Sequence, residues 1–268
     1  TDTIQGSDLV RPATDAEKTT PKVPSTKEPV ANTSSLTDGE KAKVQKNVED
    51  ANKDENGKST LPEGTTVTVG DDGTATINYK DGSKDTIPGS DLVRPATDAE
   101  KTKPKVPETK EPVANTSSLT KDEKDKVKTN VTDANKDKFP DGTTVDVGDD
   151  GTATVTYPDT STDTIKGSDL VRPETEADKI KPNVPSTKEP VANTSSLTKD
   201  EKDKVKTNVT DANKDKFPDG TKVDVGDDGT ATVNYPDGSK DTIPGDQLVQ
   251  GQKGSTTDAG NITPTVPG

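Results

Sequence analysis

Apolar side chains between residues 120 and 135 follow the period of a helix. Val127, Val131 and Ala134 are separated by four and then three positions, which places them in one narrow stripe on a helical surface. Thr120 and Glu123 stand three positions apart at its start, the spacing of a capping box. This pattern predicts a helix that begins after Thr120.

The end and the support of this helix are also predicted. Asn135 follows the stripe, and asparagine tolerates the left-handed conformation at a helix end. Asp122 and Lys126 have the spacing of a weak ion pair on the helix surface. Because a stripe this narrow cannot hold a helix alone, we expect the helix to pack on a sheet.

The residues that follow alternate between apolar and polar, the period of a half-buried strand. Alternation covers 144–147 and 152–157, and a third run starts at Asp163. Turn-forming residues separate these runs at 148–151 and 158–161. The pattern predicts three strands joined by two hairpins.

A proline-rich segment precedes the helix. Pro104, Pro107 and Pro112 favour an extended backbone, and they leave Val106 and Val113 free to pack. A Leu-Val pair at 170–171 closes the unit.

The same unit recurs along the chain. The phrase Asp-Thr-Ile-x-Gly-Ser-Asp-Leu-Val-Arg-Pro begins at 2, 85 and 163, and a variant begins at 241, so the spacings are 83, 78 and 78 residues. A period near 80 exceeds that of solenoid repeats and indicates small domains in series. The expected divisions are the end of a preceding repeat (1–12), repeat 1 (15–93), repeat 2 (98–171), repeat 3 (177–249), and a linker with the start of a following unit (250–268).

Repeat 1 is longer because thirteen residues, 52–64, replace the eight residues 135–142. An insertion between unchanged flanks indicates a surface loop. The linkers carry proline at both ends and no glycine, which favours stiffness. The chain has three arginines, Arg11, Arg94 and Arg172, and each directly follows a Leu-Val pair at a junction.

Composition alone favours disorder. Apolar residues make up 23% of the 268 residues, aromatic residues 2%, and the formal net charge is −14. The agreement between periodicity, turns and caps favours folded units instead. An acidic disordered spacer stays open as an alternative to folded units.

The missing residue types exclude most chemistry. The chain has no histidine, cysteine, methionine or tryptophan, so the usual general base, thiolate nucleophiles and the common zinc ligands are absent. We therefore expect no enzyme, no cofactor, and no catalytic, cofactor-binding or metal-binding residue. An acidic chain with few rings is a poor nucleic-acid ligand, and no apolar run is long enough to insert into a membrane.

Two recurring features have competing interpretations. The Asp149-Asp150 pair and its copies could bind calcium, although a hairpin turn accounts for them fully. The tyrosines Tyr79, Tyr157 and Tyr235 recur at one strand position, where they could form a sugar-stacking face or belong to the core. The turn and the core are the favoured interpretations.

Four motifs in this order carry a family resemblance. They are Asn-Thr-Ser-Ser-Leu-Thr-x-x-Glu-Lys-x-Lys-Val, Pro-Asp-Gly-Thr, Val-Gly-Asp-Asp-Gly-Thr-Ala-Thr and Tyr-Pro-Asp-Gly-Ser-x-Asp-Thr-Ile. Together they resemble the Rib domain, which occurs in tandem in cell-wall-anchored surface proteins of Gram-positive bacteria, and its lactobacillal long form in particular. The resemblance implies a mainly β fold, with one short helix per unit: small, reduced immunoglobulin-like domains in an elongated array.

The resemblance also implies a role. The first hypothesis is a structural stalk segment of a bacterial surface adhesin, extracellular and anchored to the cell wall through a segment outside this chain. In this role the segment is monomeric, and the parent protein meets the host cell surface or matrix. The alternative is that the repeats themselves bind a host glycan or matrix protein, with affinity gained from several copies.

Overall fold

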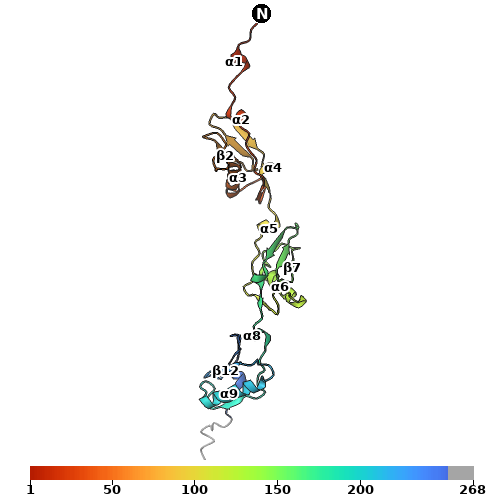
Figure 1. Cartoon of the computed structure of the whole chain (residues 1–268), viewed down its shortest axis with the longest axis vertical. Helices are drawn as coiled ribbons and strands as arrows, with labels where there is room; N and C mark the ends of the chain where they lie inside the picture. Colours follow the sequence, from red (N-terminus) through yellow and green to blue (C-terminus); the bar gives the residue numbers. More distant parts are fainter. Residues whose placement is uncertain (253–268) are drawn as a thin grey trace, which may run out of the picture. The chain divides into compact units, whose positions relative to one another are not determined.

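The computed structural model describes residues 1–252, and Figure 1 shows the succession of elements along the chain. The predicted start of a following unit therefore lies outside the described residues from 253 onward. A short helix, α1 (Gly6–Leu9), precedes repeat 1. Repeat 1 contains α2 (Asp15–Lys18), β1 (Glu28–Val30), α3 (Asp38–Ala51), β2 (Thr66–Val69), β3 (Ala75–Asn78), β4 (Lys84–Ile87), α4 (Gly89–Leu92) and β5 (Val93–Pro95).

Repeats 2 and 3 have the same order of elements. Repeat 2 contains α5 (Asp98–Lys101), β6 (Glu111–Val113), α6 (Lys121–Ala134), β7 (Thr144–Val147), β8 (Ala153–Thr156), β9 (Thr162–Ile165), α7 (Gly167–Leu170) and β10 (Val171–Pro173). Repeat 3 contains α8 (Glu176–Lys179), β11 (Glu189–Val191), α9 (Lys199–Ala212), β12 (Lys222–Val225), β13 (Ala231–Asn234), β14 (Lys240–Ile243), α10 (Gly245–Leu248) and β15 (Val249–Gly251).

Each repeat holds two small sheets. In repeat 1, β2, β3 and β4 form an antiparallel sheet in which Val67 faces Ile77 and Ala75 faces Ile87. The first and last strands, β1 and β5, pair with each other in parallel. Repeat 3 repeats both arrangements. The predicted mainly β fold is confirmed, with the predicted helix and the three predicted strands.

The core of each outer repeat comes from that repeat alone. In repeat 1, eleven buried apolar residues from β1 to β5 form one cluster, and Val44 and Val48 of α3 belong to it. Helix α3 packs against β1, β2 and β3, and Figure 1 shows it beside β2. Repeat 3 has the equivalent cluster. A core of small valines suffices because the helix covers the sheet, as the narrow stripe predicted.

The long helix of repeat 2 starts where the capping pattern indicates. The Glu123 amide donates to Thr120 Oγ1 over 3.2 Å, and the Glu123 carboxylate accepts the Thr120 amide. The predicted ion pair between Asp122 and Lys126 is wrong. Lys126 lies 3.8 Å from Glu111 of β6, because a neighbouring strand supplies a carboxylate to that face.

The asparagine after the helix does not adopt a left-handed backbone. Asn52 has φ −106° and Asn213 has φ −124°, and Asn135 is absent from the positive-φ residues of the described chain. All three side chains are instead buried. The predicted helix end at Asn135 is confirmed, since α6 ends at Ala134. The expected left-handed backbone is wrong, because the side chain of this asparagine, and not its backbone, has the structural role.

The proline-rich segment packs only in part. Val113 is fully buried in β6, whereas Val106 is 41% exposed. Its counterparts Val23 and Val184 are similarly exposed. Only the valine that enters the strand pair reaches the core.

Each repeat opens with a short helix that the proline pattern did not predict. Helices α2, α5 and α8 each begin with a complete capping box. The signal was present in the sequence, since Thr97 and Glu100 have the same spacing as Thr120 and Glu123. Helices α4, α7 and α10 carried no comparable signal, because their Gly-Ser-Asp-Leu or Gly-Asp-Gln-Leu sequences lack a cap side chain.

The insertion in repeat 1 forms the expected exposed loop. Residues 53–60 are exposed, and one isolated bridge joins Lys53 to Ser59. Leu61, at the end of the loop, packs against the core. It takes the sequence position of Phe139 and Phe217, so the insertion keeps the apolar residue that closes the core.

One turn of repeat 2 holds a residue in an unfavourable conformation. Thr160 has φ 72°, whereas Gly82 and Gly238 occupy the same turn position at φ 84° and 87°. The turn keeps the same hydrogen bond, from the Thr160 amide to the Tyr157 carbonyl over 2.9 Å. A β-branched residue is strained there, because its Cβ crowds the backbone at positive φ.

We therefore expect Thr160→Gly to stabilise repeat 2 by about 0.5–1 kcal/mol. This is the difference between the backbone strain that the substitution removes and the larger conformational entropy that glycine has in the unfolded chain. Hydrogen exchange of the amides of β8 and β9 within the whole chain measures this locally. The matched variant Gly82→Thr is expected to destabilise repeat 1. Faster exchange in β8 after Thr160→Gly would contradict the strain argument.

Candidate functional site

The buried polar side chains of residues 1–252 have hydrogen-bond partners within the protein. Asn52, Asn135 and Asn213 are the buried polar residues of the described chain, and every buried side-chain nitrogen or oxygen in residues 1–252 has a partner. Over the same residues, no three histidine, cysteine or acidic side chains come together as a metal site would require. The absence of catalytic, cofactor-binding and metal-binding residues stays a prediction.

The recurring tyrosines belong to the core. Tyr79, Tyr157 and Tyr235 are 4%, 2% and 4% exposed, so none offers a ring face to a sugar. The Tyr79 hydroxyl donates to Asp85 Oδ2 over 2.7 Å. Burial, together with this carboxylate, raises the pKa of Tyr79. Phe217 packs edge-on against Tyr235 with ring centroids 6.0 Å apart.

The two aspartates of the Asp-Asp turn have separate structural roles. Asp72 Oδ1 accepts the Thr74 amide over 3.0 Å and closes the turn between β2 and β3. Asp71 bonds to residues outside the turn. Its backbone carbonyl accepts the Leu36 amide over 2.8 Å, and its carboxylate pairs with Lys41. These contacts support the turn interpretation over a calcium loop.

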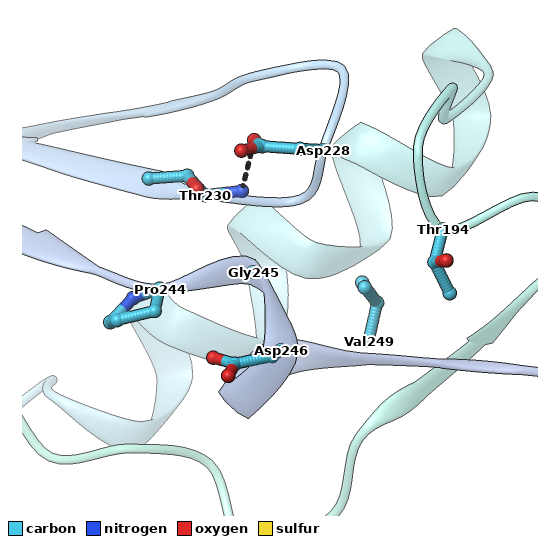
Figure 2. A pocket seen from close by; sticks show the side chains of 7 residues that line it. All are labelled: Thr194, Asp228, Thr230, Pro244, Gly245, Asp246 and Val249. Carbon is cyan, nitrogen blue, oxygen red and sulfur yellow. Dashed lines mark hydrogen bonds between the residues drawn. The ribbon is translucent and has the colours of Figure 1, made fainter.

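The surface of repeat 3 contains a hollow that could take a ligand. It has a volume of about 470 Å³. Figure 2 shows the Asp228 carboxylate bound to the Thr230 amide beside it, at 3.0 Å, and Val249 on its apolar side. The residues around it are Thr194, Asp228, Thr230, Pro244, Gly245, Asp246 and Val249.

Repeat 2 has a hollow at the equivalent place. Its volume is about 340 Å³, and Thr116, Asp150, Gly167 and Val171 occupy the positions of Thr194, Asp228, Gly245 and Val249. Ser168 stands where repeat 3 has Asp246. Hydroxyl and carboxylate groups beside a small apolar wall suit a hydroxyl-rich ligand.

The chain enters a repeat beside the second hairpin turn. In repeat 1, the Asp15 amide of α2 donates to Asp81 Oδ2 over 2.7 Å, and the Ala16 amide donates to Ser83 Oγ over 3.0 Å. Repeat 3 makes the same bonds from Glu176 and Ala177 to Asp237 and Ser239. The entering helix is therefore attached to the turn between β3 and β4, or its counterpart.

The chain leaves a repeat beside the first hairpin turn. Gly89, at the start of α4, lies so close to that turn that a Cβ there would stand 2.0 Å from the Asp72 carbonyl oxygen. A Cβ on Gly73 would stand 3.0 Å from Val93 of β5. Because β3 runs from the first turn to the second, entry and exit lie at opposite ends of the sheet. Repeat 3 has the same contacts at Gly245 and Gly229.

Each arginine directly follows a Leu-Val pair and binds a carboxylate of the short helix that comes next. Arg94 of β5 forms a forked pair with Glu100 of α5, at 2.6 and 2.9 Å, and it also donates to the Pro95 carbonyl. Arg11 pairs with Glu17, and Arg172 with Asp178, in the same way. We call these three pairs the arginine braces. Arginine suits this position because its planar fork matches a carboxylate, which lysine cannot do.

The braces have a measurable titration signature. The hydrogen bond from Arg94, followed by the one from the Thr97 amide, lowers the pKa of Glu100 to about 2. The unfolded value is about 4.3, so the brace contributes stability above that pH and loses it as the pH falls through 2. Whole-repeat stability is expected to change little, since exposed ion pairs are weak.

We expect the Glu100 carboxyl carbon to titrate near pH 2 in carbon-13 NMR of the whole chain. Arg94→Gln is expected to return the midpoint toward about 4.3. Arg94→Lys keeps the charge without the fork and is expected to fall between the two. A wild-type midpoint above 4 would refute the brace.

Comparison with known proteins identifies each repeat. The family model of the atypical Rib domain matches residues 19–96, 102–174 and 180–252, which together make up most of the chain. No curated protein matches the sequence significantly. Within residues 1–252, no helix is both long and apolar enough to cross a bilayer.

Solved structures show only slight likeness. The sialic acid binding region of a Streptococcus sanguinis SK1 adhesin bound to 3'sLn aligns with 90% of this chain and 69% of its own, at 24% identity and a TM-score of 0.32. The SrpA adhesin of Streptococcus sanguinis aligns with 37% of this chain and 49% of its own, at 30% identity and a TM-score of 0.29. The GspB Siglec domain aligns with 42% and 72%, at 21% identity and a TM-score of 0.28. These scores are too low to carry any conclusion about this chain.

Proposed function

Because this chain belongs to the atypical Rib domain family, with three copies in tandem, we propose that it is a structural spacer of a bacterial surface adhesin. In this role it projects a functional domain away from the cell. An extracellular location, anchoring to the cell wall and a monomeric state are parts of the same proposal, and contact with the host is made through the parent protein.

The position of the two ends of each repeat carries this proposal. In repeats 1 and 3 the chain enters beside one end of the three-stranded sheet and leaves beside the other. A domain of this kind adds its own length to the chain, whereas a domain with adjacent ends would not. The arginine braces support the same role, because those of Arg94 and Arg172 hold the residues that follow repeats 1 and 2.

Intramolecular distances test the spacer directly. The chain has no cysteine, so dyes can be attached at introduced cysteines without removing any. Ala13, Ala96 and Glu174 occupy equivalent positions before successive repeats. We expect fluorescence energy transfer to give a 13-to-174 distance near twice the 13-to-96 distance. A 13-to-174 distance no longer than the 13-to-96 distance would reject the spacer.

The recurring hollow favours a second candidate, weak adhesion by the repeats themselves. Its position is shared by repeats 2 and 3, and tandem copies would add avidity. Beads carrying the whole chain, tested on epithelial cells and mucin, separate the two functions. If the hollow is adhesive, retention is expected to fall when Ser168 and Asp246 at its rim are both replaced by lysine. Retention no higher than on blank beads favours the spacer.

A further inference from the structure

The first and last strands of each repeat are neighbours with the same direction. Glu28 pairs with Val93, and Val30 pairs with Pro95, in a parallel register. The Ala96 amide extends the ladder with a bond of 2.9 Å to the Val30 carbonyl. The same pairing joins β6 to β10 and β11 to β15.

This pairing determines how tension acts on a repeat. In a parallel pair, the amino end of β1 and the carboxyl end of β5 lie at opposite ends of the two strands. Pulling the chain from both sides therefore slides the strands along each other. All bonds of the pair are loaded together, whereas an antiparallel pair of terminal strands would open one bond at a time.

The strand pair is also tied to the core. Val30 is 1% exposed and Val93 is 5% exposed, and both belong to the central cluster of repeat 1. Sliding β1 against β5 must therefore pull apolar side chains out of the core while the hydrogen bonds break. Val191 and Val249 have the same positions in repeat 3.

We propose that the β1–β5 pair and its counterparts β6–β10 and β11–β15 are mechanical clamps, which keep each repeat folded under tension along the chain. This function goes beyond spacing, because a passive spacer needs no resistance to force. It rests on the proposed function only for the origin of the tension.

Two pulling geometries on the same repeat test the clamp. The first variant of the whole chain carries Lys27→Cys and Ala96→Cys, which place the handles at opposite ends of the strand pair. The second carries Ala31→Cys and Ala96→Cys, which place both handles at the same end. Lys27 and Ala31 are exposed and flank β1. Both variants span nearly the same length of chain, and each retains every residue of β1 and β5.

We expect the unfolding force of repeat 1 in the first geometry to be at least twice that in the second at equal loading rate. Forced unfolding reports the barrier to unfolding, so equal melting temperatures of the two variants exclude a difference in stability. Equal forces, or a higher force in the second geometry, would overturn the clamp. The distances that test the spacer do not depend on this force, so either proposal can fail alone.

Discussion

Gly245→Ala is expected to destabilise repeat 3 by about 3 kcal/mol or more, a large value for one methyl group. A Cβ at this position would stand 2.0 Å from the Asp228 carbonyl oxygen and 3.0 Å from two backbone carbons of the same turn. Since these are backbone atoms, no side-chain rotation relieves the overlap. Helix α10 must move away, and Leu248 and Val249 then leave the core.

The chain contains its own control for this substitution. Gly6 starts α1 in the same Gly-Ser-Asp-Leu motif as Gly89, yet nothing lies within 4 Å of a Cβ there. Gly6→Ala is therefore expected to change the free energy of unfolding of the repeats by less than about 0.5 kcal/mol. Hydrogen exchange of β13 in the whole chain, with β3 of repeat 1 as internal reference, measures the loss. A loss below about 1 kcal/mol for Gly245→Ala would show that the close approach is not required.

Asn213→Ala is expected to destabilise repeat 3 by about 2–4 kcal/mol, because it leaves buried backbone groups without partners. Asn213 Nδ2 donates to the Asn183 carbonyl over 2.9 Å and to the Val209 carbonyl over 2.8 Å. Its Oδ1 accepts the Asn183 amide over 2.6 Å. The side chain thus ties the end of α9 to the proline-rich segment that leads into β11.

Asn234 provides the matched control. It lies on β13, and its side-chain Nδ2 donates to Asp224 Oδ2 at the surface over 3.0 Å. Repeat 2 has Thr156 at this position, so Asn234→Thr is expected to be close to neutral. Denaturant unfolding, monitored by hydrogen exchange of the α9 amides, distinguishes the stabilities of the two variants. Similar small losses for both would mean that water replaces the bonds of Asn213.

Local patterns predicted the long helix and the hairpins because their signals lie within a few residues. The Val127–Val131 spacing and the Thr120 cap are read over one or two helical turns. The alternation through Val155 and Tyr157 likewise defines which side chains face inward. The core position of the tyrosines and the turn position of the Asp-Asp pairs are confirmed, since scarce aromatic residues and turn sequences have strong local preferences.

The candidate sites that depend on distant residues could not be predicted in this way. The hollow of repeat 3 joins Thr194 to Asp228 and Val249, which are far apart in the chain. The sequence predicts a backbone role for Asn135, the counterpart of Asn213, because nothing near Asn213 in sequence shows that Asn183 needs a partner. The sequence places the arginines at the junctions, but the pairing of Arg94 with Glu100 depends on the helical turn of α5 that brings them together.

The amino-acid sequence by itself determined that this chain contains three small repeats in series and has neither histidine nor cysteine. It also determined which side chain of each strand is buried, since alternation specifies a face. Only the tertiary structure decided that β1 pairs with β5 in parallel, and that entry and exit lie at opposite ends of the sheet. The physical reason is that periodicity specifies the buried face of an element but carries no information about which distant element covers it or in which direction that element runs.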